Sequence, residues 1–181
     1  AGITPGADGG AIRVARMHPQ TLYVGTNTAG AFKSTNRGGT WSPINDGLGS
    51  LSIHSFALQT SNPAIIYAGT TGGIFKSTSG ATLWSPANQG LAVSDVRALA
   101  LDPQQPETIY AGEHDTGVGV FKSTNGGTTW GAAGNGLTSP VIQSLAIAPD
   151  DPRTLYAASA SAGIFKSTDS AANWKPANGG L

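Results

Sequence analysis

The residues best suited to chemistry in this chain form one short run, Glu113-His114-Asp115. Two carboxyl groups and an imidazole can serve as acid, base or ligand-binding groups when they face one reacting atom. The other Glu of the chain, Glu107, sits in a proline-containing turn. Glycosidase carboxylates normally flank the scissile bond from opposite sides, whereas Glu113 and Asp115 share one loop. The run therefore indicates either a ligand-contacting loop or a solvated insertion, rather than a catalytic pair.

Other kinds of catalytic or metal site lack the residues that they need. The three His, at positions 18, 54 and 114, lie in different parts of the chain without the spacing of a metal site. The sequence has no Cys, which excludes disulfides and thiolate ligands, and no Gly-x-Ser-x-Gly elbow of a serine hydrolase. We therefore expect no metal and no cofactor.

Composition excludes two classes of partner. The chain has 10 basic and 10 acidic residues, and charged residues make up 11% of the total. Such a neutral chain has no electrostatic footprint for nucleic acid, and no apolar run reaches the roughly 18 residues of a membrane span. Abundant Gly with few Lys and Glu favours a secreted protein, extracellular or periplasmic.

The acidic run lies inside a motif that occurs four times. Each copy starts at a Tyr, continues through Gly or Ala to Phe-Lys-Ser-Thr, and ends after a turn at a Trp. The copies are Tyr23–Trp41, Tyr67–Trp84, Tyr110–Trp130 and Tyr156–Trp174. A period of about 44 residues is typical of propellers and related arrays.

Each repeat predicts four strands. A short run with partial alternation comes first, at residues 11–17, 52–58, 95–101 and 141–147. After a proline turn come a strand that contains Tyr, a strand that contains Phe-Lys-Ser, and a short strand after Trp. Pro in this short strand cannot donate a hydrogen bond, which predicts that the strand lies at an outer edge. We predict an all-β fold, a β-propeller of four four-stranded antiparallel blades. It is expected to form a single domain over residues 1–181, with units of about 11–50, 51–93, 94–139 and 140–181.

Two repeated slots carry charge or polarity. Lys33, Lys76, Lys122 and Lys166 occupy one slot and are interpreted as solvated or hairpin-pairing residues, not as an anion-binding ring. Arg13 and Arg97 are assigned to a second shared slot, with His54 and Gln143 in or near it in the other units.

The turn before each Trp reads Ser-Thr-Asn-Arg-Gly-Gly-Thr-Trp in the first copy and Ser-Thr-Asn-Gly-Gly-Thr-Thr-Trp in the third. It resembles the Asp-box, or BNR repeat, with its pattern Ser-x-Asp-x-Gly-x-Thr-Trp. In such a turn the side-chain oxygen accepts backbone N–H bonds, Gly supplies a positive φ, and Trp fastens the turn to its blade. The matching residues are Ser34, Asn36, Gly38, Trp41, Ser77, Trp84, Ser123, Asn125, Gly127, Trp130, Ser167, Asp169 and Trp174.

Two copies depart from the box. The second has Ser79, Ala81 and Leu83 in the acid, Gly and Thr slots, and the fourth keeps Asp169 but has Ala171 and Asn173. We expect these turns to be looser or differently bonded, and Trp84 to be held less firmly than Trp130.

Proteins with Asp-boxes include sialidases, xyloglucan-cleaving glycoside hydrolases, sortilin-type receptors and photosystem assembly factors, so the resemblance implies a fold and not one function. A sialidase would need an Arg triad and a Tyr nucleophile, but all four Tyr here fill one repeat slot. The xyloglucan-cleaving type implies a catalytic Asp where this chain has Asn27. An amide cannot transfer the proton that glycoside cleavage requires.

One face of the predicted propeller departs most from the repeat. Links between the second and third strands should emerge there with the links between units. They supply the ligand-binding candidates Asn27, Thr71, Glu113, His114, Asp115 and Ser161. Loops that vary on a regular scaffold commonly carry function.

We therefore predict a non-catalytic extracellular propeller that acts as a structural or interaction module. The alternatives are a glycoside hydrolase or a fragment of one, and a lectin-like glycan-binding module. The expected partner is a protein or another copy of the chain, and a glycan is a further option. Four blades can close as a ring, pair into eight blades, extend as a filament, or belong to a larger propeller; these stay open.

Overall fold

A computed structural model describes residues 9–14, 20–91, 95–115 and 117–181 of the chain. The predicted all-β fold of four four-stranded antiparallel blades is confirmed. Blade 1 contains β1 (Gly9–Val14), β2 (Leu22–Thr26), β3 (Ala31–Ser34) and β4 (Ser42–Pro43). Blade 2 contains β5 (Ile53–Leu58), β6 (Ile66–Thr70), β7 (Gly73–Ser77) and β8 (Ser85–Pro86). Blade 3 contains β9 (Val96–Leu101), β10 (Ile109–Glu113), β11 (Val120–Ser123) and β12 (Gly131–Ala132). Blade 4 contains β13 (Ile142–Ile147), β14 (Leu155–Ser159), β15 (Gly163–Ser167) and β16 (Lys175–Pro176).

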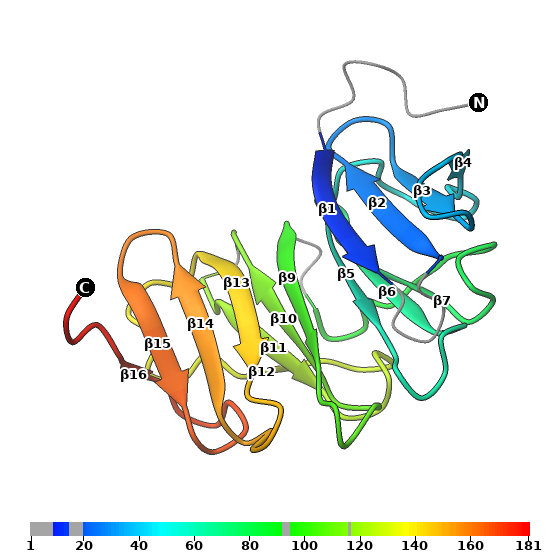
Figure 1. Cartoon of the computed structure of the whole chain (residues 1–181). Helices are drawn as coiled ribbons and strands as arrows, with labels where there is room; N and C mark the ends of the chain where they lie inside the picture. Colours follow the sequence, from blue (N-terminus) through cyan, green and yellow to red (C-terminus); the bar gives the residue numbers. More distant parts are fainter. Residues whose placement is uncertain (1–8, 15–19, 92–94, 116) are drawn as a thin grey trace.

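The blades stand side by side along an open arc, with blade 1 and blade 4 at its two ends (Figure 1). Neighbouring blades meet mainly through their first strands, β1 with β5, β5 with β9, and β9 with β13. Each blade holds its own four strands in chain order, so no blade mixes strands from both chain ends. The described part of the chain contains no helix long and apolar enough to cross a membrane.

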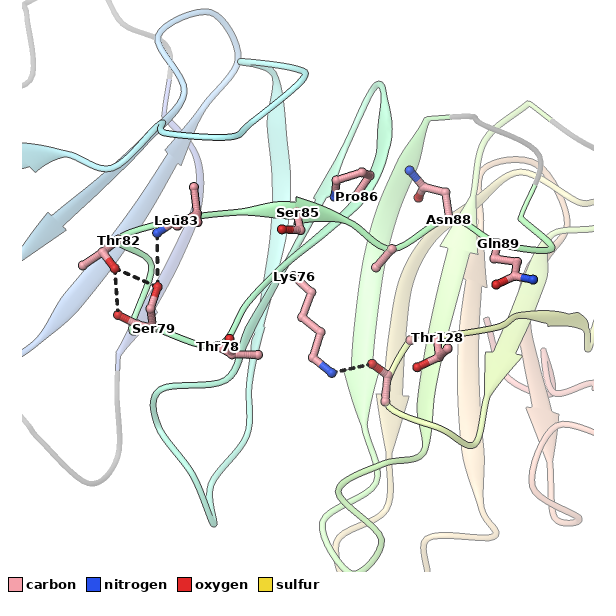
Figure 2. A pocket seen from close by; sticks show the side chains of 13 residues that line it. Lys76, Thr78, Ser79, Thr82, Leu83, Ser85, Pro86, Asn88, Gln89 and Thr128 are labelled. Carbon is pink, nitrogen blue, oxygen red and sulfur yellow. Dashed lines mark hydrogen bonds between the residues drawn. The ribbon is translucent and has the colours of Figure 1, made fainter.

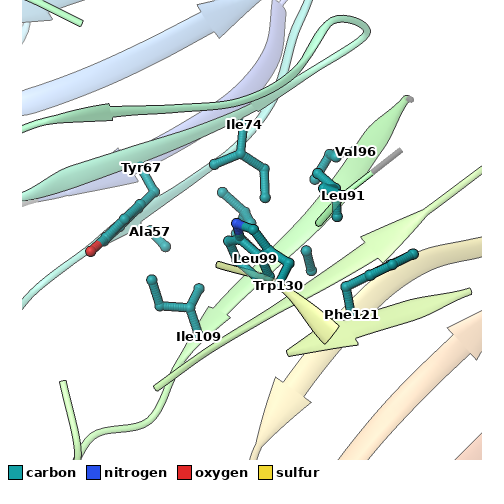
Figure 3. Packing of buried hydrophobic residues seen from close by; sticks show 10 residues of the cluster. Ala57, Tyr67, Ile74, Leu91, Val96, Leu99, Ile109, Phe121 and Trp130 are labelled. Atoms are coloured by element: carbon teal, nitrogen blue, oxygen red, sulfur yellow. The ribbon is translucent and has the colours of Figure 1, made fainter. Parts of the chain in front are cut away.

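The hydrophobic core lies between blades rather than within them. One cluster combines Tyr67 and Ile74 of blade 2 with Leu99, Phe121 and Trp130 of blade 3 (Figure 3). Similar clusters fill the joints between blades 1 and 2 and between blades 3 and 4. A single blade therefore cannot bury its apolar faces alone, as in other repeat architectures.

The turns before Trp are built from side-chain acceptors. In blade 3, Ser123 Oγ accepts the amide of Gly127 at 2.9 Å, and Asn125 Oδ1 accepts the amide of Thr129 at 2.9 Å. The fourth copy keeps both kinds of bond and is not looser, since Asp169 accepts the backbone and side-chain N–H groups of Asn173. The second copy is differently bonded, because Ser79 Oγ replaces the amide oxygen at 3.2 Å.

In blades 2 to 4 the Trp side chain packs on its own blade, as expected, and also fastens its turn to the preceding blade. Trp84 Nε1 donates to the carbonyl of Ile44 at 2.8 Å, and Trp130 Nε1 donates to the carbonyl of Ala87 at 2.8 Å. Trp84 is 2% exposed and Trp130 is 6% exposed. The departures in the second box therefore leave its Trp fully buried.

Candidate functional site

A β-bulge interrupts every innermost strand near the end where the links between units enter. The pairing with the second strand skips one residue in each blade: Gly10, His54, Arg97 and Gln143. A bulge leaves its extra residue outside the regular alternation and re-aims its side chain, and bulges occur often beside functional sites. Arg13 pairs with Tyr23 instead, so its assignment to the slot of Arg97 is wrong.

The bulge residues of blades 2 to 4 join Asp95 in a chain of polar contacts, here called the polar row. His54 Nε2 lies 3.0 Å from Asp95 Oδ1 as an ion-pair contact without the angle of a hydrogen bond. Arg97 Nε donates to Asp95 Oδ2 at 2.9 Å, and an Arg97 terminal nitrogen donates to Gln143 Oε1 at 3.2 Å. The polar row thus connects three blades through side chains that the sequence places far apart.

The predicted acidic run lies next to the polar row. The backbone N–H of His114 donates to the carbonyl of Asp95 at 2.9 Å, and His114 Nδ1 lies 2.6 Å from Asp115 Oδ1. The side chains are 34% exposed for His114 and 60% exposed for Asp115, so both face solvent. This places two of the six predicted ligand-binding residues beside Asp95 and Arg97.

Three of these groups could hold a divalent cation. Asp95, His114 and Asp115 each offer one donor atom, and the three atoms lie within 4.8 Å of one another. The expectation of no metal site depended on His residues in different units, yet the fold brings His54 and His114 both to Asp95. Asp95 already pairs with His54 and Arg97. The cluster therefore offers three donor atoms, which are fewer than a complete coordination shell requires.

Glu113 occupies a different environment from its two neighbours in the run. It ends β10 and is 0% exposed, at the position where the other blades have Thr26, Thr70 and Ser159. Thr26 Oγ1 and Thr70 Oγ1 each donate to a carbonyl of their own short link, at 2.9 Å. Glu113 is therefore placed beneath the longer third link rather than on its surface.

The other three candidates stay separate in their own blades. Asn27 is exposed, Thr71 Oγ1 lies 2.8 Å from Ser50 Oγ, and Ser161 Oγ lies 2.9 Å from Ser139 Oγ. The links that carry Thr71 and Ser161 thus contact the segments entering their blades from the preceding unit. Sequence reasoning missed His54, Asp95, Arg97 and Gln143 as one group; the available signal was the variation of residue type at the bulge slot.

The grooves between blades belong to the architecture. The groove between blades 2 and 3 lies between Lys76 and Gln89 on one side and Thr128 on the other, and Lys76 Nζ donates to the carbonyl of Gly126 at 2.8 Å (Figure 2). An equivalent groove lies at the next joint, with Lys122 and Ser170. Lys76 thus pairs with Tyr67 across its hairpin, as expected, and also reaches the next blade. Because grooves of the same kind lie at both of these joints, they do not mark a ligand site.

Buried Tyr residues at the joints have altered acidity. Burial raises the pKa of Tyr67 to about 12, and the negative charge of Glu107 adds to the effect. Burial also raises the pKa of Tyr110 to about 12, with a further contribution from Asp102. Both phenols stay neutral at physiological pH, so neither is an activated nucleophile.

No family model and no curated protein matches this sequence. Among solved structures, an ancestral GH74 enzyme has a TM-score of 0.83 and 22% identity, over 98% of this chain and 25% of that one. YCF48, solved bound to a D1 peptide, has a TM-score of 0.71 and 16% identity, over 97% of this chain and 56% of that one. The extracellular domain of BT4673 from B. thetaiotaomicron has a TM-score of 0.71 and 16% identity, over 96% of this chain and 23% of that one.

This chain therefore spans about a quarter of the length of the GH74 enzyme and just over half of YCF48. These proteins are of different kinds, and each is less than 25% identical to this chain. What the likenesses establish is the fold: the chain is built as a β-propeller array.

Proposed function

We propose that this chain is a non-catalytic interaction module of an extracellular or periplasmic propeller protein. One observation carries the proposal. At the face that holds the polar row and the third link, here called the mouth, Asp95 and Asp115 belong to one cluster of polar contacts and are not two opposed carboxylates. Asp95 is held by His54 and Arg97, and Asp115 is held by His114. A glycosidase needs two carboxyl groups about 5–9.5 Å apart on either side of the scissile bond.

Neither Glu113 nor the position of Asn27 supplies a second, opposed carboxylate. Glu113 is buried in blade 3, and Asn27 fills the position where the xyloglucan-cleaving type would have its Asp. The mouth instead presents mixed donors and acceptors from Arg97, Gln143, His114 and Asp115. Such a surface suits hydrogen bonding to a polar ligand, with the polar row fixing the side-chain positions.

Two finer proposals accompany this function. The turns before Trp are proposed to be Asp-boxes, on the strength of the bonds made by Ser34, Asn36, Ser123 and Asn125. An extracellular location is supported by the composition and by the structural likeness to the extracellular domain of BT4673. A neighbour with a bound peptide supports a protein ligand as the first choice.

A glycan ligand is the second candidate, favoured by the likeness to a GH74 enzyme over 98% of the chain. It predicts sugar binding at the same mouth without cleavage. The glycoside hydrolase alternative predicts cleavage as well.

A paired assay separates these functions. The chain is incubated with xyloglucan and with sialosides while released reducing sugar is measured, and it is applied to a peptide array and a glycan array. The proposal expects no turnover and array binding that Arg97→Gln weakens. Arg153→Gln is the matched control, because Arg153 is exposed outside the mouth. Turnover that Glu113→Gln or Asp115→Asn abolishes would refute the proposal, and glycan hits without turnover would favour the second candidate.

A further inference from the structure

Every joint between described blades uses the same pair of Trp contacts. The indole N–H of the following blade donates to a carbonyl of the preceding blade, from Trp84 to Ile44, Trp130 to Ala87 and Trp174 to Ala133, at 2.8, 2.8 and 2.7 Å. The backbone N–H groups of the same Trp residues donate two residues further along, to Asp46, Gln89 and Asn135. In blades 1 to 3 the segment that follows the outer edge strand thus supplies two carbonyl acceptors for the Trp of the next blade.

A second contact runs in the opposite direction across each joint. Lys33, Lys76 and Lys122 donate from Nζ to the turn carbonyls of Gly80, Gly126 and Ser170 in the following blade, at 3.0, 2.8 and 3.1 Å. Each Lys also lies over the ring of the Tyr that pairs with it, 5.3–5.5 Å from Nζ to the ring centre. The accepting residue has a positive φ in every turn, which turns its carbonyl toward the Lys.

A Gly completes the fit at each joint. A Cβ atom at Gly47, Gly90 or Gly136 would lie 2.1–2.4 Å from the carbonyl oxygen of the following Trp. A real side chain cannot approach a backbone oxygen so closely, and each of these Gly residues also has a positive φ. The joint is therefore a specific, closely packed interface that the chain builds three times.

In each joint the preceding blade contributes a Tyr, a Lys, a Gly and the carbonyls that accept from Trp, here called the preceding half. Blade 4 has the same residues, and among the described residues no further blade packs against them. Tyr156 is 39% exposed, whereas Tyr23, Tyr67 and Tyr110 are 0–3% exposed. Lys166 Nζ lies 5.6 Å from the Tyr156 ring centre, like its equivalents. Lys166 and Ala177 line a groove like that of Figure 2, but without the wall that Gly126–Thr128 supply there. A Cβ at Gly180 would meet no atom within 4 Å.

Blade 1 carries the complementary half. Trp41 is only half-buried, whereas the three Trp residues inside joints are 2–6% exposed. Arg37 has a φ of 59° and occupies the turn position of Gly80, Gly126 and Ser170, whose carbonyls accept the Lys bonds. The two half joints lie at opposite ends of the arc (Figure 1).

We infer that blade 4 of one copy binds blade 1 of a second copy through this same joint. Lys166 Nζ then donates to the carbonyl of Arg37, and Trp41 Nε1 donates to the carbonyl of Ala177. The occupant is a second copy because the chain itself carries the surface that fits, shown at three internal joints. Two reciprocal joints unite two arcs into an eight-bladed ring with two-fold symmetry, within the usual range of blade numbers. The Trp and Lys contacts of this joint involve none of the residues of the polar row, so variants at Trp41 and Tyr156 leave the residues of the proposed ligand site unchanged.

The test is the mass of the 181-residue chain in solution. Size exclusion with light scattering across a concentration series is expected to show a species of twice the 18.2 kDa chain mass. Tyr156→Lys puts a charge on the blade 4 half and should weaken dimerisation by about 30-fold or more, as loss of a central aromatic anchor does. Leu51→Lys is the matched control, since Leu51 is 44% exposed in a link outside both halves.

Mixing variants tests the head-to-tail arrangement. Trp41→Ala disables the blade 1 half, and Trp41→Phe, which removes the indole N–H but keeps an aromatic ring, replaces it if the Ala variant unfolds. Each single variant should be monomeric, while an equal mixture of Trp41→Ala and Tyr156→Lys should recover one joint and twice the chain mass. A wild-type chain that stays monomeric, a dimer that survives Tyr156→Lys, or a mixture that shows no recovery overturns the inference.

Discussion

Replacing single Trp residues should reveal that the blades stabilise one another across their joints. Trp130→Ala removes a side chain that is 6% exposed and lies between blades 2 and 3. Removing a buried Trp costs about 3–5 kcal/mol in free energy of unfolding. Part of that loss is the bond to Ala87, whose carbonyl loses its indole donor. Trp130→Phe keeps most of the ring and should lose only about 1–2 kcal/mol, the size of one hydrogen bond and some packing.

Trp41 provides the comparison within the same chain. It occupies the same place in its turn but is only half-buried and has no preceding blade among those described. Trp41→Ala should therefore cost less than half as much as Trp130→Ala. Trp84→Ala should match Trp130→Ala, because Trp84 is 2% exposed and also stacks with Phe56 at 6.3 Å between ring centres.

Urea unfolding followed by far-ultraviolet circular dichroism measures these costs without relying on Trp fluorescence. The protein concentration must lie below the range in which copies associate, so that Trp41 is compared in the monomer. Equal losses for Trp41→Ala and Trp130→Ala would contradict the argument that Trp acts on the preceding blade. A loss at Trp84 well below that at Trp130 would instead support the view that the box residues hold the Trp.

Three further predictions concern the turns and the joints. Ser170 has a φ of 60°, so Ser170→Gly should be more stable than Ser170→Ala by at least about 1 kcal/mol in urea melts; a more stable Ala variant would contradict the strain. Because the pKa values of Tyr67 and Tyr110 are raised to about 12, the unfolded phenols ionise first and stability should fall between pH 10 and pH 12. The double Phe variant should flatten that fall, and an unchanged slope would refute the assignment. Hydrogen bonds from Asn173 and Ser167 lower the pKa of Asp169 from 3.8 to about 2. Its stabilisation should be complete above pH 4 and lost as the pH falls through 2, and Asp169→Asn should remove this dependence in acid melts.

The sequence was sufficient for the blades because each strand repeats in phase with its neighbours. Tyr, Phe-Lys-Ser and Trp recur in the same order in every repeat, and Pro two positions after Trp marks the short edge strand in three of the four repeats. These are local patterns that a period of about 44 residues makes visible. The partial alternation in the first strand was also enough to place β5, β9 and β13 within one residue of their starts.

The contacts between blades could not be read in the same way. Lys33 and Gly80 are 47 positions apart, and nothing in the Phe-Lys-Ser-Thr pattern indicates that the Lys reaches the next turn. The direction in which Trp points depends on the angle between blades, which no local pattern encodes. The interpretation of the Lys residues as solvated or hairpin-pairing was right about the pairing with Tyr across the hairpin, and it missed the bond to the next turn.

The polar row was missed because it depends on bulges. Regular alternation would give the innermost strands one set of side chains toward the axis, and a single extra residue changes that set. Arg13 and Arg97 look equivalent by counting, but the register places Arg13 opposite Tyr23 and Arg97 at the bulge. Only the pairing with the second strand separates them.

The bulge slot also separates the demands of fold and function. At the joints, Trp, Lys, Tyr and Gly recur because each fills a space that the neighbouring blade defines. At the bulge slot the residue changes from Gly to His, Arg and Gln across the blades, although the backbone makes the same bulge each time. The fold therefore does not require any one side chain there. A binding surface needs side chains that can vary while the backbone stays the same. His54, Arg97 and Gln143 are therefore the residues on which the proposed function most depends.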